Sequence, residues 1–453
     1  MQWDTITKKY EPDLLQDLQS VIKIASVKDA STARPGAPFG SEIARALDWY
    51  LARAEAMGFR VKNVAGYAGH VEYGQGEEIL AILAHLDVVP AGQDWDVDPF
   101  GGVIKDGKVI GRGAMDNKGP AMIALYALKA IKDSGVAVNK RIRIIVGTDE
   151  ESGMGCVEYY LQHEEMPTLG FSPDAEFPLI HAEKGILQFQ ATWQCPGPLV
   201  YVSGGERPNV VPQIAEARLR GTDYAAELRR LSEGDADFKL EVEGEELKLT
   251  AFGRLAHASM PDRGKNAITH LLRYLAQLDL GPQQKLLEVL AAAGTGIYGE
   301  GLNIALADEV SGKLTANVGI IDFKEDTGYI VFDVRSPVTL PLQDTLNRAE
   351  QTLHQSGFKT QVLEFEPPHY VPKDSPLVQT LLRVYQEFTG DMSEALAIGG
   401  GTYAKKLKGG VAFGPLLPGR EDVAHISNEY MSIADINLSF KIYTKAILEL
   451  AQT

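Results

Sequence analysis

Cysteine is nearly absent from this sequence of 453 residues, which contains only Cys156 and Cys195. Two cysteines are too few for the disulfide framework that stabilises small secreted domains. We expect both to be reduced thiols that pack as small side chains. A lowered pKa of Cys156 near a helix start is the alternative, but packing is the simpler interpretation.

Basic residues are outnumbered by acidic ones, with 44 Lys and Arg against 61 Asp and Glu and a net charge of −17. This sign is wrong for binding a phosphate backbone or an anionic membrane surface, so we expect neither nucleic acid nor membranes as partners. Long hydrophobic runs are also lacking, since no stretch approaches the ~20 apolar residues that span a bilayer. The first residues, MQWDTITKKYEPDLLQDL, contain no apolar core of signal-peptide length, and we expect a cytoplasmic protein.

The chain is long enough for more than one hydrophobic core, and its 45% hydrophobic and 23% charged residues are typical of folded globular proteins. Residues 1–185 alternate helix and strand signals, which predicts an α/β domain with a mixed sheet covered by helices. Helical apolar spacing covers residues 13–27 and 41–58. Residues 77–87 and 141–151 instead have the continuous Ile, Leu and Val runs of strands buried on both faces.

The pattern changes near residue 186. Alternating strands such as ILQFQATW and KLTANVGIIDF are interspersed with helices such as NAITHLLRYLAQL. We therefore expect an inserted α+β domain over residues 186–385, built from two sandwich-like halves. Residues 386–453 return to the first domain and contain a glycine-rich loop, IGGGT, and a final helix. One domain interrupted by another is the simplest architecture.

Side chains able to bind metals follow apolar runs or occupy turns in five short segments. These are AHLDVVP with His85 and Asp87, GRGAMDNKG with Asp116, TDEESG with Glu150 and Glu151, SPDAE with Asp174, and DVAHISNE with His425. In α/β sheets the loops at the carboxyl ends of strands gather at one edge. Residues that are far apart in the sequence can therefore meet there.

Each of these segments also has a purely structural interpretation. The histidines could be satisfied polar or capping residues, Asp116 a helix N-cap, the Glu150–Glu151 pair a favourable charge at a helix start, and Asp174 a turn residue. Together, however, the segments supply two imidazoles and several carboxylates, a set suited to Zn²⁺, Mn²⁺ or Co²⁺. Two metals would need one shared carboxylate, and the acids would repel one another without cations.

The segments LAHLDVVPAG, GRGAMDNKG, TDEESG, SPDAEFP and HASMPDRGKNA, in this order, resemble the M20-type metallopeptidase family, which contains aminoacylases and desuccinylases. The stretch SPDAEFPLIHAEKG, the large middle domain and the overall length are most similar to the PepV-type bacterial dipeptidases of that family. The resemblance covers essentially the whole chain. It implies a catalytic domain in two parts, 1–185 and 386–453, and a lid domain over 186–385 made of two ferredoxin-like halves.

The resemblance also implies a site for two divalent metal ions, with Zn²⁺ as the first expectation and Mn²⁺ or Co²⁺ as alternatives. The implied metal ligands are His85, Asp116, Glu151, Asp174 and His425. Asp116 would be the bridging carboxylate, with His85 and Asp174 completing one site and Glu151 and His425 the other. Asp87 would accept the imidazole N–H of His85 and fix its tautomer. Asn117 stands where some relatives carry an acid, which should matter little because Asp116 is the expected bridge.

The implied reaction is hydrolysis of the amide bond of dipeptides or short peptides with a free N-terminus by a water that two metals activate. Glu150 occupies the position of the general base, which takes a proton from this water and passes it to the leaving amine. His257, on the lid, would donate to the tetrahedral oxyanion, so the lid would have to close on the substrate. From the bare sequence, His257 could equally be a turn histidine beside a helix start.

Recognition of a small peptide substrate is assigned to the middle and last parts of the chain. Arg335 would bind the substrate carboxylate, although a charge at a strand end is the alternative. Asn209 and the backbone amides around Gly400 and Gly401 would add hydrogen-bond donors, unless these glycines only form a tight turn. The length of the lid favours a monomer. The competing functions are an N-acyl-amino-acid deacylase or desuccinylase and a non-catalytic metal-binding scaffold.

Overall fold

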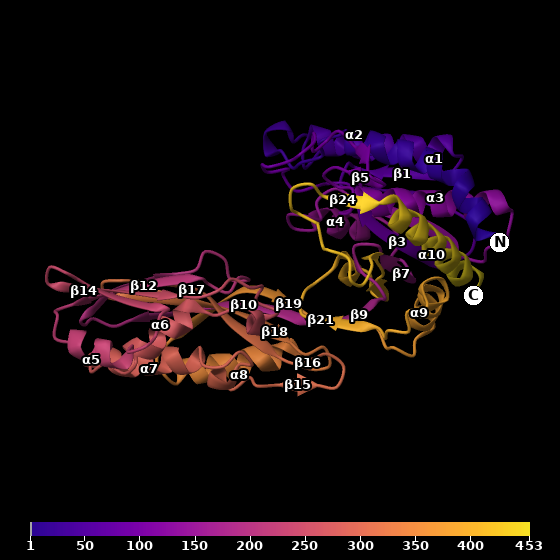
Figure 1. Cartoon of the computed structure of the whole chain (residues 1–453). Coiled ribbons are helices and arrows are strands. Elements are labelled where there is room, and N and C mark those ends of the chain that lie inside the picture. Colours follow the sequence, from indigo (N-terminus) through magenta and orange to yellow (C-terminus); the bar gives the residue numbers. More distant parts are fainter. Residues whose placement is uncertain (1) are drawn as a thin grey trace. The chain divides into compact units, whose positions relative to one another are not determined.

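The computed structural model describes residues 2–453. By its internal contacts the chain divides into two compact units, which are coloured along the sequence in Figure 1. Unit 1 comprises Met1–His181, Val371–Leu396 and Thr402–Thr453, and unit 2 comprises Ala182–Tyr370 and Ala397–Gly401. One unit is thus interrupted in sequence by the other.

Unit 1 contains a mixed sheet. Its strands, in order across the sheet, are β1 (Arg60–Val64), β2 (Ala68–Tyr73), β6 (Arg141–Gly147), β3 (Ile79–His85), β7 (Leu169–Ser172), β22 (Gly410–Ala412) and β9 (Ile180–Glu183). The short strands β20 (His369–Tyr370) and β21 (Leu396–Ile398) both pair with β9. Strands β6, β3, β7 and β22 run parallel to one another, whereas the pairs β1–β2, β2–β6 and β22–β9 are antiparallel. The expected α/β fold class is confirmed.

Strand β3 shows why the centre of this sheet is stable. All seven of its residues are buried, and successive side chains point to opposite faces. Leu80 and Ile82 join the larger hydrophobic core, which also contains residues of helices α1, α2, α3, α9 and α10, whereas Ala81 and Leu83 join a smaller core with helix α4. The run of apolar residues is therefore continuous because helices cover both faces.

The helices of unit 1 begin and end as follows: α1 Trp3–Ile22, α2 Ser41–Ala56, α3 Lys118–Ser134, α4 Gly155–His163, α9 Pro376–Thr389 and α10 Ile433–Gln452. The first helix differs from the expected residues 13–27. It starts at Trp3 because Ile6, Tyr10 and Leu14 extend the same packed face toward the N-terminus, and it ends before the β-bridge at Val27. No helix of the described residues is long and apolar enough to cross a membrane.

Unit 2 is built on an antiparallel sheet of eight strands. Their order is β13 (Phe238–Glu243), β14 (Glu246–Phe252), β12 (Ile214–Arg220), β11 (Leu199–Gly204), β17 (Thr315–Lys324), β18 (Thr327–Ser336), β10 (Gly185–Gln194) and β19 (Lys359–Glu366). Two groups of four strands meet where β11 pairs with β17. The two expected halves therefore share one continuous sheet.

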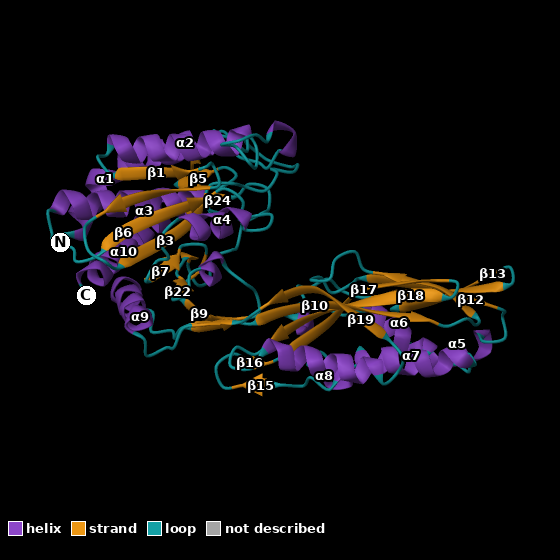
Figure 2. Ribbon diagram, turned by 180° about the vertical axis from the view of Figure 1, so that it is seen from behind, coloured by secondary structure: helices purple, strands orange, loops and turns teal. Residues whose placement is uncertain are grey.

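Helices lie along one face of this sheet, as Figure 2 shows. They are α5 (Ala225–Leu231), α6 (Ala267–Leu275), α7 (Pro282–Ala293) and α8 (Leu342–His354). Leu271 of α6, Leu290 of α7 and Leu346 of α8 share one hydrophobic core with Leu187 and Phe189 of β10. The expected domain end at residue 385 lies inside α9, which packs against α10 in unit 1.

Both cysteines are free thiols. Burial raises the pKa of Cys156 to about 11 and also raises the pKa of Cys195. Cys156 lies in the smaller core of unit 1, with its Sγ 3.1 Å from the hydroxyl of Tyr403. A raised pKa keeps a thiol protonated and unreactive, so Cys156 acts as a packing residue.

The aromatic packing behind strand β7 generates a stability prediction. Phe171 is fully buried, and its ring centroid lies 5.5 Å from that of Phe413 and 5.6 Å from that of Tyr443. Phe171→Ala should lower the free energy of unfolding by about 3–5 kcal/mol, because it leaves a cavity between these rings. Met166→Ala, at an exposed side chain of the same unit, should change it by less than about 0.5 kcal/mol. Denaturant unfolding followed by circular dichroism measures both, and equal effects would contradict the packing argument.

Candidate metal centre

Three neighbouring parallel strands bring metal-capable side chains to one edge of the sheet of unit 1. Strand β3 ends at His85, β6 leads into Glu150 and Glu151, and β7 leads into Asp174 two residues after its end. Because β3 lies between β6 and β7, these side chains start from adjacent positions. The carboxyl edge of parallel strands is where α/β proteins usually bind ligands.

Asp116 lies between two groups of donor atoms. Its Oδ1 is 2.9 Å from His85 Nε2, which is 3.6 Å from Asp174 Oδ2. Its Oδ2 is 2.9 Å from His425 Nε2, which is also 2.9 Å from Glu151 Oε2. Within each group the donor atoms all lie within 4.8 Å of one another. The two oxygens of one carboxylate thus face two different pairs of a histidine and an acid.

His425 reaches this group from a loop that precedes strand β24 (Tyr430–Ser432). Its φ of 62° places it in the left-handed region, which a residue with a Cβ adopts only at a cost. Neighbouring contacts fix the loop, since Ser427 donates to the carbonyl of Gln93 and Asn428 accepts the N–H of Asp96. The loop holds His425 in a conformation that directs its imidazole to Asp116 and Glu151.

The pKa values show what charge this group of side chains favours. Hydrogen bonds to Asp116 and Glu151 raise the pKa of His425 to about 10. Burial lowers the pKa of His85, but Asp174 and Asp116 outweigh this effect and raise it well above its ordinary value. Burial acts to raise the pKa of Asp116, but hydrogen bonds from the two histidines lower it. The surrounding acids therefore stabilise positive charge at this place.

The donors also fit a pair of divalent ions. Burial raises the pKa of Glu151 and of Asp174, so their negative charges are poorly compensated by the protein. Among the described residues Glu151 Oε1 is buried without any hydrogen-bond partner, an expensive state for a carboxylate oxygen. Two imidazoles and three carboxylates, one of them the shared Asp116, form a ligand set that suits Zn²⁺, Mn²⁺ or Co²⁺.

Asp87 makes different contacts from those expected. The imidazole Nδ1–H of His85 donates to the backbone carbonyl of Asp87 at 3.0 Å, and the nearer carboxylate oxygen lies at 3.5 Å. Both carboxylate oxygens accept backbone N–H groups, one from Glu150 and one from Glu151, each at 3.1 Å. The residue thus orients His85 mainly through its main chain and holds the turn after β6 through its side chain.

Glu150 lies beside the metal-capable residues. Burial, followed by the nearby charge of Asp174, raises its pKa to about 8. A carboxyl group with such a pKa can exchange a proton near neutral pH, which a general base requires.

Asn117 contributes more than its sequence position suggests. Its Nδ2 donates to Asp174 Oδ1 at 2.9 Å and to the carbonyl of Pro173 at 2.7 Å, and its Oδ1 accepts the N–H of His85 at 3.4 Å. It therefore joins the loops that carry Asp174 and His85 and leaves Asp174 Oδ2 free to face His85. The only signal in the sequence was its place next to Asp116.

The other expected site residues belong to unit 2. His257 Nδ1 accepts the backbone N–H of Ser259 at 3.1 Å and lies 2.7 Å from the Ser259 hydroxyl. Because a backbone N–H can only donate, the ring proton of the neutral imidazole is on Nε2. Burial and the charge of Arg335 lower the pKa of His257, which keeps the ring neutral at pH 7. The geometry makes Nε2–H a hydrogen-bond donor.

Arg335 is buried at the end of strand β18 and is tied to Asp333. Its Nε and Nη2 donate to the two carboxylate oxygens of Asp333 at 2.6 and 2.9 Å, and Gln188 donates to the same carboxylate. One edge of the guanidinium is thus occupied, while Nη1 makes a long contact of 3.4 Å with the carbonyl of Gly399. The remaining N–H groups lie on the Nη1 side.

The glycine-rich loop has its close approach at Gly399. A Cβ built on Gly399 would lie 2.7 Å from Ser259 Cβ, whereas a Cβ built on Gly400 would meet no atom within 4 Å. Gly400 and Gly401 lie in unit 2 with His257 and Arg335. Gly399 is therefore the position in this loop that must lack a side chain, because its backbone packs directly against Ser259.

Asn209 lies in a braced segment of unit 2. The Nδ2 of Asn317 donates to the carbonyls of Pro208 and Val210 at 3.2 and 3.0 Å, and the carbonyl of Asn209 accepts the N–H of Ala258. Val210 forms a β-bridge with His257. The backbone on both sides of Asn209 is therefore fixed next to His257.

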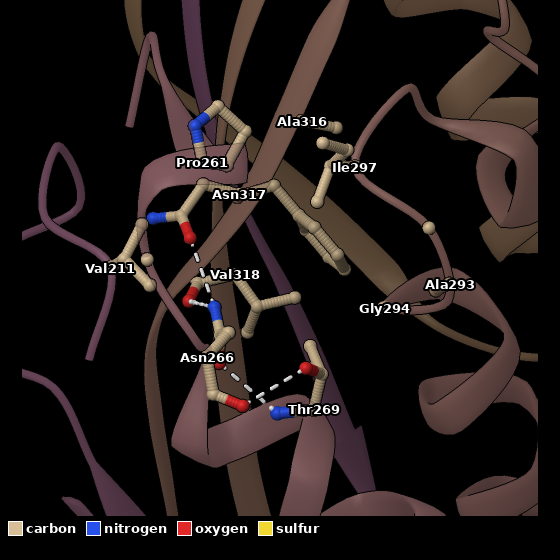
Figure 3. A pocket seen from close by; sticks show the side chains of 13 residues that line it. Val211, Pro261, Asn266, Thr269, Ala293, Gly294, Ile297, Ala316, Asn317 and Val318 are labelled. Carbon is tan, nitrogen blue, oxygen red and sulfur yellow. Dashed lines mark hydrogen bonds between the residues drawn. The ribbon is translucent and has the colours of Figure 1, made fainter. Parts of the chain in front are cut away.

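Asn317 also lines a cavity of about 170 Å³, shown in Figure 3. There Asn266 points toward Asn317, donating to its Oδ1 at 2.9 Å, and caps helix α6 by accepting the N–H of Thr269. The residues around this cavity are Val211, Pro261, Gly264, Asn266, Thr269, Ala293, Gly294, Gly296, Ile297, Ala316, Asn317, Val318 and Phe332. None of these is ionisable, so the cavity lacks the groups for acid–base chemistry.

Comparison with known proteins agrees with this chemistry. The family model described as peptidase family M20/M25/M40 matches residues 81–449. The chain is 41% identical to the putative dipeptidase YtjP of Bacillus subtilis (strain 168), with 100% of each chain covered. It is 37% identical to the putative dipeptidase SAR1836 of Staphylococcus aureus (strain MRSA252), with 99% of each covered.

Solved structures share the fold at low identity. Human carnosine dipeptidase 1 matches with a TM-score of 0.60 and 15% identity, covering 100% of this chain and 99% of that chain. Aminoacylhistidine dipeptidase from Vibrio alginolyticus matches with a TM-score of 0.59 and 16% identity, covering 97% of each chain. The family model thus covers most of the sequence, and the curated relatives cover nearly all of it. The chain belongs to peptidase family M20/M25/M40.

Proposed function

We propose that the protein is a metal-dependent dipeptidase that hydrolyses the amide bond of dipeptides or short peptides with a free N-terminus. The observation that carries this proposal is the position of Asp116, whose two oxygens each face a histidine and a second acid. The names of the relatives, putative dipeptidases of similar length, support the substrate class.

The proposed metal ligands are divided between two ions that share Asp116. His85 and Asp174 would hold one ion, and Glu151 and His425 the other. Such ions, when bound, supply an acidified water and a Lewis acid for the scissile carbonyl. We propose Zn²⁺ as the native ion because nitrogen and oxygen donors are mixed, although Mn²⁺ and Co²⁺ accept the same set.

Glu150 is proposed as the general base. It takes a proton from the attacking water and passes this proton to the nitrogen of the leaving amine. Burial and the neighbouring acids raise its pKa, whereas two bound cations would lower it, so that the carboxylate could both gain and lose a proton within one reaction cycle.

Unit 2 is proposed to supply groups for the oxyanion and for the substrate carboxylate. The neutral His257, with its proton on Nε2, would donate to the oxyanion of the tetrahedral intermediate. Arg335 would bind the carboxylate through the guanidinium edge that Asp333 leaves open. Asn209 and the backbone amides at Gly400 and Gly401 would add hydrogen bonds.

Two further properties are proposed from the chain as a whole. The eight strands of unit 2 form one sheet within a single chain, which supports a monomer that needs no partner to complete its site. The scarcity of cysteine and the free thiols suit a reducing compartment, which supports a cytoplasmic location.

A substrate panel distinguishes this function from that of an N-acyl-amino-acid deacylase. Free dipeptides should be hydrolysed, and both N-acetyl-amino acids and dipeptide amides should have kcat/KM values lower by about 10–100-fold, because each lacks one charged end and its charge-assisted hydrogen bonds. Amino-acid release measured by mass spectrometry gives these rates. Faster hydrolysis of N-acetyl-amino acids would contradict the proposal, and activity that survives removal of metal by a chelator would exclude the mechanism.

Metal content tests the shared carboxylate. His85→Ala and His425→Ala should each lose one ion and keep the other, whereas Asp116→Asn should lose both, because only Asp116 serves the two groups. Inductively coupled plasma mass spectrometry of desalted protein counts the ions. An Asp116→Asn protein that retains two ions would remove Asp116 from its bridging role.

The role of Glu150 is tested by turnover with metal content as the internal control. Glu150→Ala should lower kcat by at least ~100-fold, because the proton transfer loses its base, while both ions stay bound. Glu165→Ala, at an exposed residue that pairs with Arg141, should keep the kcat of the unmodified protein. If Glu150→Ala kept a tenth of the activity, another group would have to be the base.

A further inference from the structure

The turn that carries Asp116 closes around a buried acid from a distant part of the chain. Glu429, four residues after His425, has no exposed surface. Its Oε1 accepts three backbone N–H groups, from Gly113 at 3.0 Å, Met115 at 2.8 Å and Asp116 at 3.0 Å. One carboxylate oxygen therefore satisfies most of the main-chain donors of residues 113–116.

The second oxygen of this carboxylate is fixed by a buried cation. Arg112 is 1% exposed, and its Nη1 donates to Glu429 Oε2 at 2.7 Å. Its Nη2 contacts the carbonyl of Ala91 at 3.3 Å, and its guanidinium lies over the ring of Trp95 at 5.4 Å. Arg112 thus connects Glu429 to the loop that follows His85 and Asp87.

We propose that Glu429 is a positioning residue for the metal centre, holding the 113–116 turn so that the two oxygens of Asp116 face both donor groups. Glu429 does not contact the side-chain atoms that would bind metal. It acts through the backbone N–H of Asp116 and through the loop that it shares with His425. This inference rests on the proposed function, because it concerns the same ions.

The proposed role has a specific signature. Loss of a peripheral ligand such as His85 affects one ion, but a shift of Asp116 weakens both at once because both share its carboxylate. A purely structural role of Glu429 would instead lower stability and leave the affinity for metal unchanged. The affinity of both ions, measured on folded protein, separates these two possibilities.

Glu429→Gln is the informative variant because it preserves the shape of the side chain, while it removes the negative charge and replaces one acceptor oxygen with an NH₂ donor. In either orientation of the amide, its NH₂ group faces donors, either the three backbone N–H groups or the guanidinium of Arg112. Glu72→Gln is the matched control, since Glu72 bonds to Arg143 in a largely buried ion pair on strands β2 and β6 of the same unit.

The experiment titrates Zn²⁺ into chelator-treated protein by calorimetry, with circular dichroism and thermal melting of the metal-free forms. Glu429→Gln should raise the dissociation constants of both ions by at least tenfold, while the metal-free protein keeps its fold. Glu72→Gln should lower only the melting temperature. Unchanged affinity in Glu429→Gln, weakening of a single ion, or equal weakening in Glu72→Gln would each overturn the proposal.

A second variant covers the case in which Glu429→Gln does not fold. Arg112→Lys keeps the positive charge but loses the second contact of the guanidinium, so the affinity for both ions should fall together by a smaller factor. Unchanged affinity would then overturn the proposal. If the unmodified protein bound no Zn²⁺, Mn²⁺ or Co²⁺, the proposed function would fail and this inference with it, whereas the other outcomes decide on Glu429 alone.

Discussion

Repulsion among buried carboxylates is the constraint on which the rest of unit 1 depends. Asp116, Glu150, Glu151 and Asp174 lie close together, and only two imidazoles balance them. At an effective dielectric constant of 20, two like charges 4 Å apart repel by about 4 kcal/mol. Burial raises the pKa of three of these acids, which shows that the protein alone does not compensate their charge. Divalent cations bound at this cluster would compensate that charge.

The surrounding structure holds these groups together against that repulsion. Parallel strands β6, β3 and β7 supply a rigid edge, and hydrogen bonds fix the loops that follow them. Asp87 accepts two N–H groups of the turn after β6, Asn117 joins the loops of His85 and Asp174, and Glu429 holds the turn of Asp116. Each contact fixes the backbone of a loop that carries a candidate ligand, and thereby orients that side chain.

The sequence predicts the strand ends well because local signals mark them. Continuous apolar runs that stop at His85 and shortly before Glu150 identify buried strands, and their polar ends identify an edge. The hydrogen-bond partners were not predictable. The pairing of Asp87 with the turn after β6, of Asp333 with Arg335, and of Ser259 with His257 depends on side-chain directions. The start of α1 was missed because its apolar residues are sparse before Leu14.

The two units differ in the charge that they could offer a substrate. Unit 1 brings together acids and two histidines. Unit 2 contains the neutral His257 and the guanidinium of Arg335, one edge of which is hydrogen-bonded to Asp333. A dipeptide carries a positive amine and a negative carboxylate at its ends, and within unit 2 the guanidinium of Arg335 is the group that would suit the carboxylate. A charged His257 would attract the substrate carboxylate as well, and would then compete with Arg335 for it. A lowered pKa of His257 would therefore serve selectivity as well as the proposed hydrogen bond to the oxyanion.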